Sequence, residues 1–128
     1  MEIFYVLIAL AVISIVVVLA SRKHAKLKEA TIKRILRLWD DAVARRNPNT
    51  RVLEAEKVVD LLLRELGHTG SFGDKLKTIG KSLPNEQAVW SAHKLRNRIA
   101  HEAGVEVSER EAEIAIKSFG RVITKYTR

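Results

Sequence analysis

The sequence predicts an all-α protein with a single N-terminal transmembrane helix followed by a four- or five-helix bundle. Of residues 1–20, only Glu2 and Ser14 are not apolar, whereas residues 21–128 have the mixed, charged composition of a soluble domain. In this second part apolar residues recur at spacings of three and four, which is helical periodicity, and strand patterns are nearly absent. The length allows one domain of modest core beside the apolar segment and excludes a second globular domain.

The first twenty residues are the predicted membrane anchor. The run from Ile3 to Ala20 holds 18 residues without a charge. As a helix rising about 1.5 Å per residue it covers roughly 27 Å, close to the ~30 Å of a bilayer core. Lys and Arg are concentrated directly after it, and this bias places Met1 outside and the rest of the chain in the cytoplasm. We therefore expect a single-pass membrane protein with a cytoplasmic C-terminal domain.

Two other interpretations of the apolar run remain open. A cleaved signal peptide is one, because Val18-Leu19-Ala20 resembles a cleavage site. However, such a peptide has a basic region before its apolar run, and here only Met1 and Glu2 precede it. A buried core helix is the other. A retained anchor fits the length and the flanking charges better than either.

The net charge of +8 is distributed unevenly. Residues 21–46 carry nine Lys or Arg against three acids, a net of +6, whereas residues 47–128 carry fourteen against eleven, a net of +3. Residues 21–30 thus form a basic juxtamembrane segment beside the lipid bilayer. Such a segment favours attraction to anionic lipid headgroups over a generally basic nucleic-acid surface.

The helical domain, residues 31–128, should contain four helices besides a short one. We expect helices at about residues 31–46, 51–66, 74–82 and 85–103, and one that follows Ser108. The Asn47-Pro48 pair ends the first of these, and Thr50 or Asn49 caps the second. Two further signals mark the later helices. Pro84 starts the helix that Gly104 closes, and Ser108 with Glu111 forms a capping box.

One arginine stands out on the helix at residues 85–103. On a helical wheel Arg96 falls inside an arc of apolar residues, which are Ala88, Val89, Ala92, Leu95, Ile99 and Ala100. A charged group among core positions is unfavourable unless it is paired or lies at a partner surface. Arg96 therefore needs a second surface, either a carboxylate such as Glu56 or Asp60 or another copy of the chain.

The hexapeptide RNRIAH, residues 96–101, resembles the R-N-x-x-x-H signature of HEPN-domain proteins, which are four- or five-helix bundles. The resemblance covers roughly residues 30–128, although six residues carry the signature. It implies metal-independent RNA cleavage, with RNA as substrate and a site formed across a homodimer. By residue, His101 would be the general acid or base, Arg96 would stabilise charge on the phosphate, and Asn97 would orient His101 or the phosphate. His93 shares their polar stripe and is expected to be an accessory residue.

Non-catalytic functions remain open beside this hypothesis. Many HEPN-like domains are binding or scaffolding modules, so a module that holds a nucleotide, an RNA or a protein near the membrane is the alternative. A purely structural bundle is a third, with His101 placed near the end of its helix, where a cation suits the helix dipole. The chain has no cysteine and no metal-ligand spacing among its four histidines, so we expect no metal and no cofactor.

Overall fold

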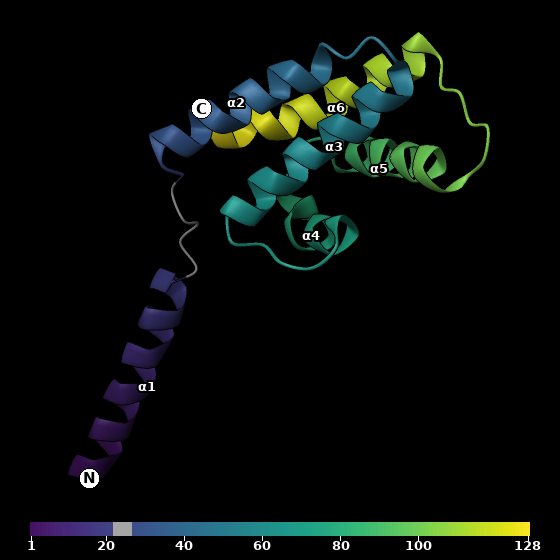
Figure 1. The fold of residues 1–128 in the computed structure, drawn as a ribbon. Coiled ribbons are helices and arrows are strands. Elements are labelled where there is room, and N and C mark those ends of the chain that lie inside the picture. The colour runs from purple at the N-terminus through teal and green to yellow at the C-terminus, as the bar shows by residue number, and fades with distance from the viewer. Residues whose placement is uncertain (22–26) are drawn as a thin grey trace.

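The computed structural model describes residues 1–21 and 27–128, and Figure 1 shows their arrangement. The described residues form α-helices and one short 3₁₀ helix, and they contain no strand. The elements are α1 (Glu2–Ser21), α2 (Glu29–Val43), α3 (Pro48–Glu65), α4 (Phe72–Ile79), η1 (Gly80–Ser82), α5 (Glu86–His101) and α6 (Glu109–Thr127). The all-α prediction is therefore confirmed for the described part of the chain.

Helix α1 has the length and composition of a membrane-spanning helix. The window Glu2–Leu19 spans 18 residues, and none of it is buried within the structure. A core helix of a soluble protein would be mostly buried, so the core-helix interpretation has no support. A signal sequence passes the same test of length and composition. Of the basic segment predicted at residues 21–30, residues 22–26 lie outside the described residues.

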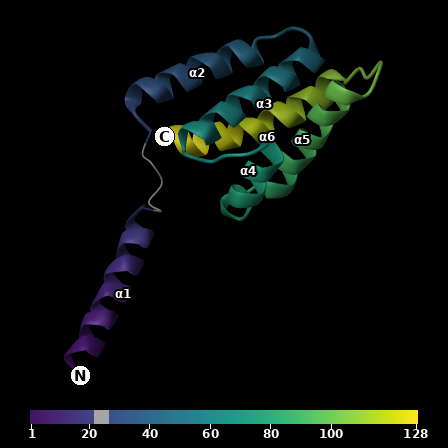
Figure 2. The same cartoon turned by 60° about the horizontal axis from the view of Figure 1, so that its bottom comes forward.

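Helix α3 is the centre of the bundle. It contacts α2, α5 and α6, and Figure 2 shows α2, α3 and α6 running beside one another, with α4 and α5 on the side of α3 away from α2. Its apolar face is fully buried and consists of Val52, Ala55, Val59, Leu62 and Leu63. The core is completed by Ile35 of α2, Leu76 of α4, Val89 of α5 and Phe119 of α6. Helix α3 therefore packs against each of the three other long helices of the bundle, α2, α5 and α6.

The start of α3 differs from the prediction. Asn47 is the N-cap, since its side-chain oxygen accepts a hydrogen bond from the Thr50 N–H at 3.1 Å. Pro48 fits the first turn because its missing N–H has no partner there in any helix. Asn49, which was predicted as one alternative for the cap, instead donates to the Val105 carbonyl at 2.6 Å and accepts from the Val107 N–H at 3.0 Å. It thereby fastens α3 to the segment before α6.

The limits of α4 and α5 differ from the prediction by one to three residues. Ser71 and Asp74 form a capping box that starts α4 at Phe72, and the last predicted turn is the 3₁₀ helix η1. Pro84 lies in a turn and does not start α5, which begins at Glu86. Gly104, with φ of +72°, follows its C-terminal end. The predicted Ser108–Glu111 capping box is confirmed.

Candidate functional site

A pocket of about 440 Å³ lies between α3, α5 and the start of α4. Its wall on α3 is made of Glu56, Lys57 and Asp60, and its wall on α5 is made of His93, Arg96 and Asn97. Residues 70–73, which are the end of the loop before α4 and the first two residues of α4, form the third side. Charged and amide side chains from helices distant in sequence therefore converge on one cavity.

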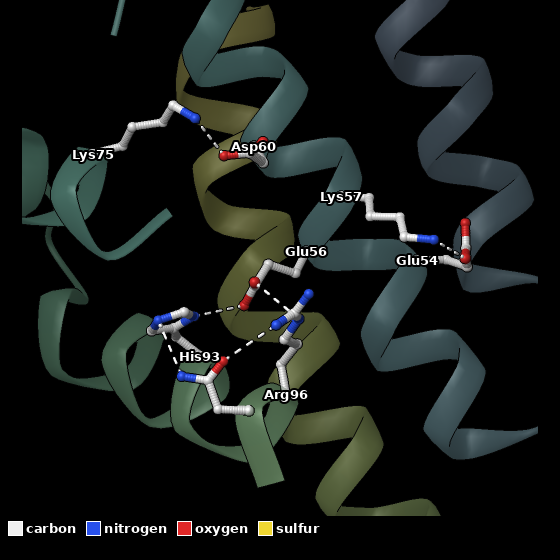
Figure 3. A network of polar contacts seen from close by, with 8 residues as sticks. Glu54, Glu56, Lys57, Asp60, Lys75, His93 and Arg96 are labelled. Atoms are coloured by element: carbon white, nitrogen blue, oxygen red, sulfur yellow. Dashed lines mark hydrogen bonds and ion pairs between the residues drawn. The ribbon is translucent and has the colours of Figure 1, made fainter. Parts of the chain in front are cut away.

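A buried glutamate holds the α5 side of this pocket together. Glu56 is 4% exposed, and its Oε2 lies 2.9 Å from His93 Nδ1. Its Oε1 lies 3.2 Å from Arg96 Nε, an ion pair whose N–H is not aligned for a hydrogen bond. Figure 3 shows both side chains meeting the carboxylate. A buried carboxylate without such partners would be strongly unfavourable, so the three residues stabilise one another.

The carboxylate of Glu56 also determines the proton arrangement on His93. An ionised carboxylate accepts hydrogen bonds only, so the Nδ1–H of His93 donates to it. In the neutral imidazole the lone pair is then on Nε2. This assignment follows from the partner and places a proton-accepting nitrogen on the side of the ring away from Glu56.

Asn97 contacts both the histidine and the arginine. Its Oδ1 accepts from Arg96 Nη1 at 3.3 Å, and its Nδ2 lies 3.4 Å from His93 Nε2. The first distance exceeds the usual range for an N–H···O bond, about 2.7–3.2 Å, and the second, between two nitrogens, is longer still. The two contacts are therefore weak, and a ligand can replace them at small cost.

Aromatic rings fix the plane of the His93 imidazole. The ring of Phe72 lies 5.0 Å away between centroids and that of Trp90 lies 5.9 Å away. A side-chain carbon added at Gly73 would lie 3.7 Å from His93 Nε2. Nε2 of His93 therefore lies beside the first turn of α4, on the side of the pocket that this turn forms.

The other end of the pocket is a second buried ion pair. Asp60 Oδ1 lies 2.7 Å from Lys75 Nζ, whose side chain is 3% exposed. Arg64 Nε lies 3.5 Å from the other Asp60 oxygen. This pair joins α4 to α3. It also neutralises Asp60, so that carboxylate has no unmatched charge to oppose an anion.

An ionised carboxylate lies in the first turn of α4, directly after the pocket residue Gly73 in the sequence. The backbone N–H of Ser71 donates to Asp74, and this bond holds the pKa of the Asp74 carboxyl below its ordinary value. The group is therefore charged at neutral pH. Its Oδ2 is occupied by that backbone donor.

The residues predicted for the site are only partly brought together. Arg96 and Asn97 line the pocket with His93. Of the two carboxylates predicted as partners of Arg96, Glu56 is the one it meets, and Asp60 pairs with Lys75 and Arg64. His101 is exposed at the end of α5 and is not among the pocket residues.

His93 and Glu56 have a larger part in the pocket than the sequence indicates, because both belong to its polar network. The signal for His93 was its spacing: three and four residues before Arg96 and Asn97, on one helical face. Glu56 had a weaker signal, as an acid on the apolar face of α3. Among the described residues no group of three His, Cys, Asp or Glu side chains is placed to hold a metal ion.

The described part of the chain is all-helical, with one helix long and apolar enough to span a membrane and a polar pocket in its bundle. No protein-family model, curated protein or solved structure matches the chain. The resemblance to HEPN-domain proteins therefore rests on the hexapeptide and its helical context.

Proposed function

We propose that the protein is a membrane-anchored HEPN-like domain that cleaves RNA without a metal ion. In this proposal α1 crosses the bilayer with Met1 outside, and the bundle lies in the cytoplasm beside anionic lipid headgroups. The observation that supports the proposal best is the position of Arg96 and Asn97. These first two residues of the signature both line the pocket, and Glu56 holds the arginine in place.

The chemistry of RNA cleavage matches these residue types. Attack by a 2′-hydroxyl needs a group that accepts its proton, a group that protonates the leaving oxygen, and a cation at the phosphate. The side chain of Arg96 is 29% exposed, so its guanidinium can meet a phosphate in the pocket. His101 is exposed on the last turn of α5, where a second copy of the chain can approach it. A homodimer would then supply His101 to the site.

The test is RNA cleavage by the full chain in detergent micelles with EDTA present. Arg96→Gln and His101→Gln should each lower the rate by roughly 10²-fold or more. Arg98→Gln is the matched control, because Arg98 is exposed on the same helix and outside the pocket, and it should leave the rate within about twofold. RNA that stays intact with the wild-type chain would overturn the proposal, as would cleavage unchanged in both variants.

A non-catalytic binding module is the second candidate, and one observation favours it. Glu56 already pairs with His93 and Arg96, so these three side chains hold their positions without a substrate. RNA that is retained by the wild-type chain and released by Arg96→Gln, without cleavage in either case, would decide for this candidate.

A further inference from the structure

We infer that the pocket of a single chain is a binding site for a ribose phosphate, with Arg96 on the phosphate and His93 Nε2 accepting a hydrogen bond from the neighbouring hydroxyl. The inference rests on the proposed function for the ligand class, a ribonucleotide. It differs in assigning the hydroxyl to His93 within one chain, where the signature would assign it to His101.

The first step is the orientation of His93. Glu56 takes the Nδ1–H at 2.9 Å, which leaves the Nε2 lone pair for another donor. Its only contact among the described residues is the Asn97 amide at 3.4 Å, longer than an ordinary hydrogen bond. A hydroxyl is a donor of the right kind to improve on that contact, because it can approach to about 2.8 Å.

The second step is the anion. Arg96 uses Nε towards Glu56 and Nη1 towards Asn97, and its Nη2 has no partner among the residues that the structure describes. The N–H groups of Nη2 can donate charge-assisted hydrogen bonds to a phosphate oxygen. Lys57 lines the same wall with a side chain that is 66% exposed. Its Nζ is turned to Glu54 at 2.8 Å, so Arg96 is the cation that this pocket offers to an anion.

The third step is the acids, which could repel an anion. Both oxygens of Glu56 face His93 and Arg96, and both oxygens of Asp60 face Lys75 and Arg64. Every pocket carboxylate is thus turned to a donor within the protein. The donor and the acceptor that remain for a ligand are Arg96 Nη2 and His93 Nε2.

The fourth step is size. A volume of about 440 Å³ lies within the range of small-molecule sites, roughly 300–1,000 Å³. It exceeds what a lone phosphate ion fills. The group that occupies the remainder must place a hydroxyl beside the phosphate, because Arg96 and His93 are three residues apart on one helix face. A ribose 3′-phosphate has this arrangement in its 2′-hydroxyl.

The experiment compares two probes that differ in one hydroxyl. Uridine 3′-monophosphate and 2′-deoxyuridine 3′-monophosphate are titrated calorimetrically into the full chain in detergent micelles. The ribonucleotide should bind about tenfold more tightly, as expected for one hydrogen bond to a buried acceptor. In His93→Gln that preference should disappear. Arg96→Gln should weaken both probes by the same factor, and Arg98→Gln, the exposed control outside the pocket, should change neither.

A second measurement needs no variant to fold. In the wild-type chain, the imidazole ¹H–¹³C signal of His93 should shift on addition of the ribonucleotide, and that of His101 should stay in place. Equal binding of the two probes, or a preference lost in His101→Gln and kept in His93→Gln, would overturn the inference. Intact RNA together with ribonucleotide binding would overturn only the proposed function. Cleavage without ribonucleotide binding would overturn only this inference.

Discussion

Replacing Glu56 by glutamine should destabilise the bundle by about 2–3 kcal/mol, because one buried carboxylate holds two donors. Hydrogen bonds to charged groups contribute about 1.5–3 kcal/mol each. The contact with His93 should contribute its full free energy, since that side chain is 14% exposed. The contact with Arg96 should contribute less, because that side chain is 29% exposed and solvent screens the charges. Glutamine keeps one acceptor oxygen but turns an NH₂ group towards a donor. The loss in unfolding free energy therefore equals about one hydrogen bond to a charged group, plus the penalty for the donor that is left unpaired.

Glu54→Gln is the matched control for this substitution. Glu54 lies two residues earlier on α3 and pairs with Lys57 at 2.8 Å, with side chains 34% and 66% exposed. An exposed pair of this kind contributes about 0.5 kcal/mol or less. Urea unfolding in detergent micelles, followed by the fluorescence of Trp39 and Trp90, measures both variants. The expected gap corresponds to roughly 10–20 °C in Tm. Unfolding free energies within about 0.5 kcal/mol of each other would refute the reasoning.

Three other predictions concern the core, a helix cap and the anchor. Phe119→Ala should lower the free energy of unfolding by about 3–5 kcal/mol, because Phe119 is fully buried. Ile114→Ala, at a residue 57% exposed on the same helix, should lower it by less than about 0.5 kcal/mol. Similar urea midpoints for the two variants would contradict the assigned buried face of α6. The Ser108 backbone N–H holds the pKa of Glu111 below its ordinary value. The stability gained is present above the ordinary pKa and is lost as pH falls through the lowered one, so Glu111→Gln should flatten the acid side of a stability-against-pH profile; an unchanged profile would contradict this. Leu10→Arg, in the middle of α1, should make membrane insertion less favourable by about 3–4 kcal/mol, and full retention in carbonate-washed membranes would argue against a spanning helix.

The helices were predictable from the sequence because each has its own periodic apolar face and local end signals. The Ser108–Glu111 box is an example, since a capping box depends on residues three apart and on nothing distant. Limits that depend on competition between neighbouring signals were harder. Asn47 and Asn49 are both good caps, and Asn47 takes the position because Pro48 can follow it in the first turn.

The site was predictable only in part, because its partners come from different helices. A helical wheel identified Arg96 as needing a partner, but spacing alone left Glu56 and Asp60 equal. The choice depends on where α4 places Lys75, which takes Asp60. The wheel also placed Ala88 and Ala100 with the core, and both are exposed. One helix cannot show how wide an arc its neighbours cover.

The short connection between α1 and α2 limits where the bundle can be. Seven residues, 22–28, separate Ser21 from Glu29, and even a fully extended chain of this length spans at most roughly 25–30 Å. If α1 is inserted in a bilayer, all chains in that membrane have their bundles next to the same membrane surface. Two chains then meet at a rate set by the number of chains per unit of membrane area. Adding lipid at constant protein would then slow any step that needs two copies, such as the use of His101 across a dimer. Ligand binding by the pocket of one chain would not change when lipid is added.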